Sequence, residues 1–394
     1  MSTAVESTPI IDTDAHVSEP PELWISRLPK KWADEAPRIR LNADRGGSED
    51  WYLGDVRLFS AGFLAVAGHD DYAPDFPKGY ADFDPAAWKV KDRLERMDEH
   101  GVYAEVLFPN VLCFYNWAFR EMANQELSLA CHRVYNDYAV EFASADPNRL
   151  IPLCILPYWN LEESVKELRR CHEMGHRGLI FGWQYHKVGL PPIMDPHWDP
   201  LFKTAEELEM SMNLHVALAT QKETTEVWQT DNVWSSKDYA RQSALSLLSN
   251  AEAIALLTTS GMLERYPNLK WLSVESGFGY LPFLLETLDW QWHNAGAFRD
   301  NPKQLLPSEA FRKHMYGSFW YESSTLSLLE LFPDNILFET DFPHPTSLSP
   351  GPASTAQTAR DTVRQSMKAL PDDVIRKVLF ENAAKLFKVD YPVG

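Results

Sequence analysis

A chain of 394 residues, 45% hydrophobic and 24% charged, has the composition of a globular protein and is long enough for one large domain or two smaller ones. Its formal net charge of −19 argues against nucleic acid and anionic membranes as partners, because both are polyanions. We find no apolar run long enough to cross a bilayer and no signal-peptide pattern in the first residues, so we expect a cytoplasmic protein.

The first predicted element ends in a pair of polar side chains. Residues 10–16, IIDTDAH, are typical of a short apolar strand that leads into Asp14 and His16. Side chains two positions apart on a strand point the same way, so both are directed beyond the strand end. The pair is half of a metal site if later strands supply partners. Otherwise, Asp14 caps the next turn and His16 is an ordinary buried histidine.

A long segment is inserted after this strand. Residues 18–83 are rich in Pro, Gly, Asp and aromatic residues and show little periodicity. Segments of this length inside a compact domain are commonly functional lids or inserted subdomains. Because this one directly follows the polar pair, we expect it to form a lid or cap within a single domain that spans residues 1–394.

From Asp84 onward, helical and strand-like segments alternate. Asp84 and Pro85 are typical of a helix start, and an apolar helical stripe ends at Gly101. We expect the later strands at residues 102–108, 150–156, 178–181, 210–216, 269–274, 315–321 and 336–338. Together with the first strand, this pattern predicts a closed (β/α)8 TIM barrel rather than an open doubly wound sheet. The lack of a glycine-rich phosphate loop also disfavours a nucleotide-binding fold.

The predicted strand ends carry further candidate ligands. His215 ends the fifth strand, Glu275 follows the sixth, and Asp341 follows the eighth. Each alone could be a core histidine, a helix cap or a turn former. Together with Asp14 and His16, however, they gather at the C-terminal face of the barrel, where active sites of this fold lie. Such a set of imidazoles and carboxylates suits one or two divalent iron, manganese or zinc ions.

Two more histidines follow predicted strands. His344 comes after the eighth strand and His186 after the fourth. Either could bind substrate or position a leaving group, and the alternative for each is a loop position outside the chemistry. We keep His344 as a candidate catalytic residue.

The segments that carry these residues resemble the amidohydrolase-2 family of the amidohydrolase superfamily, which includes aminocarboxymuconate semialdehyde decarboxylase and the hydroxybenzoate decarboxylases. The similar segments are IIDTDAH, DPAAWKVKDRLERMDEHGV, NLHVA, ESGFGYLP, FETDFPH and ENAAKLF. They span residues 9–387, with the insertion poorly covered. The resemblance implies a metal-dependent (β/α)8 enzyme that acts on a small molecule at a C–N, C–O, C–S or C–C(carboxyl) bond. It also raises a homodimer as an expectation.

The resemblance implies roles for single residues as well. It assigns Asp14, His16, His215 and Asp341 as metal ligands, and in hydrolytic members the last of these can also shuttle a proton. The sequence departs from the family after the sixth strand, where Glu275 stands in place of the usual histidine. That histidine is expected to handle protons in decarboxylating relatives, so its replacement favours hydrolysis. Glu275 would then ligate a second ion or serve as general base, unless it only hydrogen-bonds its neighbours.

We therefore predict a metal-dependent hydrolase that cleaves an amide, ester or thioester of a small organic substrate, with Asp341, Glu275 and His344 as catalytic candidates. The alternatives are a nonoxidative decarboxylase of a hydroxylated aromatic or unsaturated acid, and an inactive barrel that serves as a binding protein. Because carboxylates replace two of the family's usual histidines, we expect the site to prefer iron or manganese to zinc.

Overall fold

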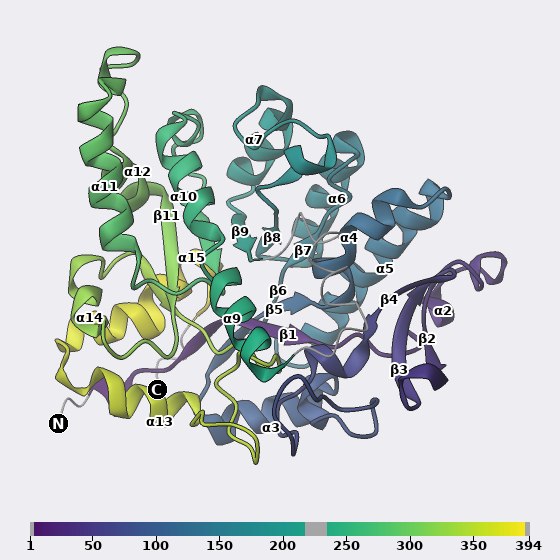
Figure 1. The fold of residues 1–394 in the computed structure, drawn as a ribbon. Helices are drawn as coiled ribbons and strands as arrows, with labels where there is room; N and C mark the ends of the chain where they lie inside the picture. The colour runs from purple at the N-terminus through teal and green to yellow at the C-terminus, as the bar shows by residue number, and fades with distance from the viewer. Residues whose placement is uncertain (1–3, 217–234, 391–394) are drawn as a thin grey trace.

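The computed structural model describes residues 4–216 and 235–390, and a barrel of parallel strands surrounded by helices forms its centre (Figure 1). The strands pair in the order β6-β5-β1-β12-β11-β10-β9-β8-β7. Their bounds are β1 Ile11–Val17, β5 Ala104–Pro109, β6 Leu150–Pro152, β7 Cys154–Ile155, β8 Gly178–Ile180, β9 Ser211–His215, β10 Trp271–Val274, β11 Met315–Phe319 and β12 Ile336–Phe338.

The sheet closes on itself through one interrupted strand. β6 pairs with β5 and β7 pairs with β8, and only Leu153 separates β6 from β7 along the chain. The two short strands are therefore halves of a single barrel strand. All pairings in this sheet are parallel, as helical crossovers require. The predicted (β/α)8 barrel is confirmed.

Helices connect the strands on the outside of the barrel. The described helices are α1 Ala4–Ser7, α2 Leu23–Arg27, α3 Val90–His100, α4 Val111–Glu121, α5 Gln125–Ala143, α6 Leu161–Met174, α7 Asp199–Glu207, α9 Ser236–Ser246, α10 Asn250–Thr259, α11 Leu281–Asn294, α12 Pro307–His314, α13 Ala359–Ser366, α14 Asp372–Arg376 and α15 Asn382–Phe387. None of the helices in the described ranges is long and apolar enough to span a bilayer.

The start of α3 differs from the prediction. The carboxylate of Asp84 does cap backbone, because it accepts a hydrogen bond of 2.9 Å from the amide of Ala86. The capped element, however, is a separate 3-10 turn over Pro85–Ala87, and α3 begins only at Val90. The helix ends as predicted at Gly101, whose φ of 72° suits glycine.

The insertion contains a sheet of its own, although its sequence shows no periodic pattern that predicts strands. Strands β2 (Pro37–Asn42), β3 (Ser48–Leu53) and β4 (Val56–Ser60) form an antiparallel sheet at the side of the barrel (Figure 1). Trp51 of β3 is buried edge-on against Trp24 of α2 at 5.4 Å between ring centroids. Farther along, the amides of Val66 and Ala67 donate to the carbonyl of Pro343 at 3.0 and 3.1 Å. The insertion thus reaches the loop after β12, while its role as a lid stays a prediction.

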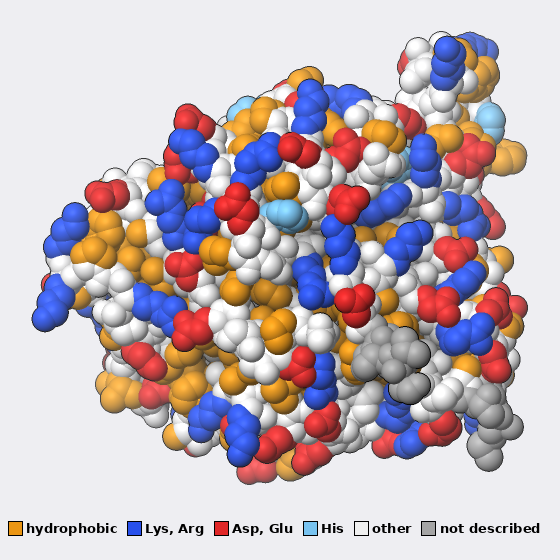
Figure 2. Space-filling view, turned by 180° about the vertical axis from the view of Figure 1, so that it is seen from behind, with side chains coloured by type: hydrophobic (Ala, Val, Ile, Leu, Met, Phe, Trp, Pro, Cys, Tyr) orange, Lys and Arg blue, Asp and Glu red, His pale blue; other side chains and the backbone are white. Residues whose placement is uncertain are grey.

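The surface has a mixed charge pattern. On the face drawn in Figure 2, Lys and Arg side chains alternate with Asp and Glu, and no broad basic area covers that face.

A buried ion pair supports the end of β1. The guanidinium of Arg93 from α3 lies 2.8 Å from the carboxylate of Glu105 on β5, and both side chains are almost completely buried. Arg93 also donates to the carbonyls of Ala86 and His16. The pair therefore holds the backbone that carries one of the candidate metal ligands.

We expect Arg93→Ala to lower the free energy of unfolding by about 3–5 kcal/mol, because it leaves the carboxylate of Glu105 buried and unpaired. Urea-induced unfolding followed by fluorescence measures this loss. The matched control is Arg169→Ala, which breaks an exposed pair with Glu207 and should leave stability unchanged. Equal effects of the two variants would contradict the supporting role of the buried pair.

Candidate metal centre

The structure brings all five predicted metal ligands together at one mouth of the barrel. Asp14 and His16 lie at the end of β1 and His215 at the end of β9, while Glu275 follows β10 and Asp341 lies beyond β12. The Nε2 atom of His16 is 3.0 Å from Nε2 of His215 and 3.3 Å from Oδ1 of Asp14. Within the triads Asp14, His16, His215 and Asp14, Glu275, Asp341, the ligand atoms lie within 4.8 Å of one another.

The backbone is bent to direct two of these carboxylates inward. Glu275 and Asp341 have φ values of 54° and 59°, in the left-handed region that non-glycine residues rarely adopt. The amide of Asp341 donates to the carbonyl of Asp14 at 2.8 Å, and the amide of Glu275 donates to the carboxylate of Glu339 at 3.1 Å. Such conformations cost about 1–3 kcal/mol each, and they persist where the surroundings hold them in place, commonly at functional sites.

The two histidines are oriented as metal ligands. The Nδ1–H of His16 donates to the carbonyl of Pro109 at 3.2 Å, and that of His215 donates to the carbonyl of Val216 at 2.8 Å. In the neutral imidazoles this arrangement leaves both Nε2 lone pairs directed at the shared centre. Nε2 of His16 and Nε2 of His215 lie 3.3 and 3.7 Å from Oδ1 of Asp14, but within the described ranges no donor reaches either oxygen of Asp14 with hydrogen-bonding geometry. Facing lone pairs and a carboxylate without donors fit a divalent cation.

The electrostatics of the cluster also favour a bound divalent cation. Burial raises the pKa of both Asp341 and Glu275 well above the ordinary range, and neighbouring carboxylates raise them further. Burial acts in the same direction on Asp14, but the imidazoles of His215 and His16 outweigh it and hold the pKa of that carboxyl low. Although burial disfavours the charged imidazole, Asp14 and Glu275 raise the pKa of His215 to about 9, so the metal-free ring holds a proton at neutral pH that a metal ion would displace from Nε2. A divalent cation among these carboxylates would relieve their repulsion.

His344 extends the cluster towards α4. Its Nδ1 lies 2.9 Å from Oδ1 of Asp341, and its Nε2 lies 2.9 Å from Oδ1 of Asn110. Its ring also stacks on His16 at 3.7 Å between centroids. The structure thus brings this candidate to the site. His186 is instead exposed on a 3-10 turn and belongs to none of the ligand groups found among the described residues.

Two residues of the site escaped the sequence analysis. The hydroxyl of Thr346 donates to a carboxylate oxygen of Asp341 and lies 3.3 Å from Oε1 of Glu275, so it bridges two candidate ligands. Asn110 orients His344 from the end of β5. Neither carries a charge that would mark it as a ligand. The available sequence signal is their position in the chain, because Asn110 directly follows β5 and Thr346 lies in the loop after β12.

A buried glutamate caps the helix beside the site. Oε1 of Glu19 accepts hydrogen bonds from the amides of Asn110 and Val111 at 3.1 and 2.9 Å, at the start of α4. Burial raises the pKa of Glu19 from 4.5 to about 8. The folded state therefore keeps a proton that the unfolded state releases at neutral pH.

We expect Glu19→Gln to become increasingly stabilising, relative to the wild type, as the pH rises from 5 to 9. The stability that Glu19 contributes is complete below the pKa of its unfolded state and is lost as the pH rises through its folded pKa of about 8. The expected difference in the free energy of unfolding between Glu19→Gln and the wild type reaches on the order of 4 kcal/mol at the upper end of this pH range. Urea unfolding at several pH values measures it. Glu22→Gln, at a nearby exposed position, should show no such trend, and a flat difference for Glu19→Gln would refute the argument.

Comparison with known sequences gives a family and several relatives. The sequence profile of the family described as Amidohydrolase matches residues 11–389. A gamma-resorcylate decarboxylase of Polaromonas sp. (strain JS666) is 26% identical over 271 residues, which cover 64% of this chain and 77% of the relative. A 2-amino-3-carboxymuconate-6-semialdehyde decarboxylase of Dictyostelium discoideum is 27% identical over 338 residues, or 82% of each chain.

Solved structures share the fold. An amidohydrolase from Mycobacterium avium subsp. paratuberculosis K-10 aligns with a TM-score of 0.75 at 18% identity, over 97% of this chain and 99% of the other. A dihydroxybenzoic acid decarboxylase from Polaromonas sp. JS666, with bound manganese and the inhibitor 2-nitroresorcinol, aligns with a TM-score of 0.58 at 20% identity, over 97% of both chains. At these identities the likeness establishes the barrel fold.

The prediction of an acyl hydrolase is wrong. The curated relatives described above are decarboxylases, which favours the alternative of a nonoxidative decarboxylase over the hydrolase. The missing strand-six histidine does not by itself exclude decarboxylation, because the titratable side chains of Glu275, Asp341 and His344 lie in the same cluster. The buried groups of ligand atoms fit the expected divalent transition-metal cofactor, and the decarboxylase structure from Polaromonas contains manganese.

The match of the family profile covers nearly the whole described chain, from β1 to beyond α15. The closed barrel and the ligands at its strand ends agree with it. The chain belongs to the amidohydrolase family and is an enzyme of the amidohydrolase superfamily.

Proposed function

We propose that the protein is a metal-dependent, nonoxidative decarboxylase of a small hydroxylated aromatic or unsaturated carboxylic acid. The observation that carries this proposal is the buried cluster of imidazole and carboxylate ligands in a chain whose curated relatives, at 26% and 27% identity, are decarboxylases of such acids. The substrate class is taken from those relatives, and the residues below are assigned from the geometry of this chain.

Asp14, His16, His215 and Asp341 would hold the metal ion. Bound there, a divalent ion supplies the positive charge that attracts substrate oxygens and withdraws electrons from the carbon that loses its carboxylate. With carboxylates at two of its positions, the set is harder than one built of histidines alone, and therefore favours iron or manganese over zinc.

We assign Glu275 as the group that delivers a proton to the substrate. Loss of CO2 breaks a C–C bond and leaves its electron pair on the substrate carbon, so one proton must be delivered to that carbon in each turnover. The side chain of Glu275 is 11% exposed, whereas those of His215 and Asp14 are completely buried. Glu275 thus lies at the open side of the cluster, 3.6 Å from Nε2 of His215. It takes the place of the strand-six histidine of the family, and Thr346 orients its carboxyl group.

The proposal is tested by CO2 release from a panel of hydroxybenzoates and unsaturated dicarboxylic acids. The protein is purified without chelator, its metal content is measured, and the panel is then run before chelation, after chelation and after reloading with Mn2+, Fe2+ or Zn2+. We expect at least one acid to release CO2, the activity to vanish on chelation, and Mn2+ or Fe2+ to restore it. Folded, metal-loaded protein that releases no CO2 from any acid would contradict the proposal. Stoichiometric zinc as the best activating ion would contradict the metal assignment.

A further inference from the structure

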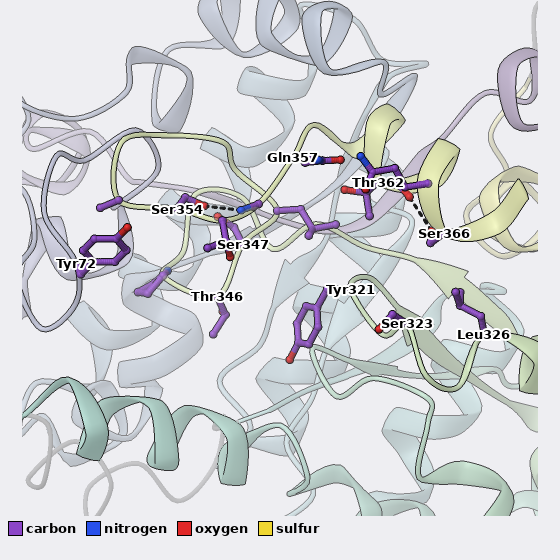
Figure 3. Close-up of a pocket in the computed structure, with 16 residues that line it drawn as sticks. Tyr72, Tyr321, Ser323, Leu326, Thr346, Ser347, Ser354, Gln357, Thr362 and Ser366 are labelled. Atoms are coloured by element: carbon purple, nitrogen blue, oxygen red, sulfur yellow. Dashed lines mark hydrogen bonds between the residues drawn. The ribbon is translucent and has the colours of Figure 1, made fainter.

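A cavity of about 690 Å3 lies beside the metal centre, within the range of about 300–1,000 Å3 that is usual for ligand pockets (Figure 3). Its walls come from the loop after β12, the segment after β11, helix α13, and the insertion. The lining residues are Tyr72, Tyr321, Ser323, Leu326, Pro345, Thr346, Ser347, Leu348, Ala353, Ser354, Thr355, Ala356, Gln357, Thr362, Gln365 and Ser366.

Thr346 connects the cavity to the metal centre. Its hydroxyl contacts the carboxylates of Asp341 and Glu275, and the same residue lines the cavity. In Figure 3, Thr346 and Tyr321 are drawn between Tyr72 at one side of the view and Leu326 at the other. A molecule whose carboxylate reaches the cluster can therefore extend past Thr346 into this space.

The residues that line the cavity favour an uncharged ligand over a charged one. Among the 16 residues that line the cavity, all within the described chain, none is Asp, Glu, Lys, Arg or His, and most carry a hydroxyl or an amide. Hydroxyls donate and accept hydrogen bonds, so they match hydroxyl groups of a ligand. The rings of Tyr72 and Tyr321 and the side chain of Leu326 supply apolar surface that can pack on a flat ring. An anionic group is disfavoured, because no Lys, Arg or His side chain of the described chain lines the cavity to pair with it.

The size of the cavity also matters. About 690 Å3 is more than a single carboxylated ring with a small substituent such as a methoxy group fills. We propose that the cavity binds an uncharged, hydroxylated ring, such as a glycosyl group or a second phenol, that the substrate carries in addition to the acid decarboxylated at the metal centre. This inference rests on the proposed function and narrows its substrate class.

Two adjacent serines provide a matched test. Ser323 and Ser324 are both exposed, but only Ser323 lines the cavity. Ser323→Trp should fill part of the cavity, while Ser324→Trp places the same side chain outside it. The probes are a dihydroxybenzoate and its mono-O-glucoside, assayed for CO2 release with metal-loaded enzyme. Binding of the glucoside, and of a phenyl glucoside without carboxylate, is measured by calorimetry.

We expect wild-type kcat/KM to be higher for the glucoside, and Ser323→Trp to lower it by at least about tenfold, which corresponds to about 1.4 kcal/mol. The same variant should change kcat/KM for the dihydroxybenzoate by no more than about twofold. Ser324→Trp should leave kcat/KM for both probes unchanged. Equal kcat/KM values for the two tryptophan variants with the glucoside would overturn the inference.

Failure of the proposed function gives a different pattern. If neither probe releases CO2, the calorimetric data decide on the cavity alone. Binding of the phenyl glucoside that is lost in Ser323→Trp and kept in Ser324→Trp supports the cavity as a binding site for an uncharged ring. Lack of binding to the wild type contradicts it.

Discussion

His215→Ala is expected to lose the bound divalent metal, and to lower CO2 release by on the order of 1,000-fold or more. His215 is the one ligand that comes from β9, across the barrel from β1, and its Nε2 atom lies 3.0 Å from that of His16. The substitution by alanine removes this nitrogen ligand. No neighbouring side chain described at the same strand end can take the place of the lost imidazole. Metal content per chain, measured by mass spectrometry, and the rate of CO2 release test both parts.

A second buried histidine serves as the control. His132 is almost completely buried, and its ring nitrogens contact the carbonyl of Ser128 and the amide oxygen of Asn116 at 2.8 and 3.2 Å, outside the metal centre. His132→Ala should reduce stability and keep the metal content of the wild type. Full metal occupancy in His215→Ala, or equal metal loss in the two variants, would show that His215 is not a ligand.

Glu275→Gln has the second large expected effect, a fall in kcat of about 10²–10⁴-fold with unchanged metal content. The substitution keeps the shape of the side chain and removes its ability to deliver a proton. Glu275→His, which introduces the residue usual in the family at this position, should recover much of the lost rate. Steady-state kinetics and metal analysis on the same preparations show whether the substitution lowers kcat or removes the metal.

Glu322→Gln is the matched control for this prediction. Glu322 is a largely buried carboxylate near the same end of the barrel, and it accepts hydrogen bonds from the amides of Phe278 and Trp320 at 2.8 and 3.2 Å. Its loss should affect stability and leave kcat within a few fold. If Glu275→Gln loses the metal, Glu275 is a ligand, and if it keeps full kcat, the proton comes from another group.

The barrel and the ligand positions could be predicted from sequence because both depend on simple periodic rules. Buried parallel strands leave continuous apolar runs, and all their C-terminal ends face the same side. Asp14, His215 and Asp341 each follow such a run, so their convergence needs no knowledge of side-chain packing. The structure places them within one small cluster.

The remaining features depend on contacts that sequence patterns do not encode. The sheet of the insertion consists of strands of five or six residues with charged positions, such as Arg38 and Glu49, which lack a clear alternation. Thr346 and Glu19 each make two hydrogen bonds that no sequence pattern predicts. Thr346 bonds to the carboxylates of Asp341 and Glu275, and Glu19 bonds to two amides at the start of α4. The sequence does not predict the reaction, because the same ligand set supports both hydrolysis and decarboxylation and the single residue Glu275 does not distinguish them.

The origin of the hydrogen in the product tests the central claim most directly. Metal-loaded protein is incubated in deuterated water with an acid from the panel, and CO2 and product are quantified by mass spectrometry. We predict one CO2 for each acid consumed, and one deuterium in the product at the carbon that carried the carboxylate. Consumption of the acid with retention of its carboxyl carbon, or a product without solvent deuterium at that carbon, would contradict metal-dependent decarboxylation at this centre.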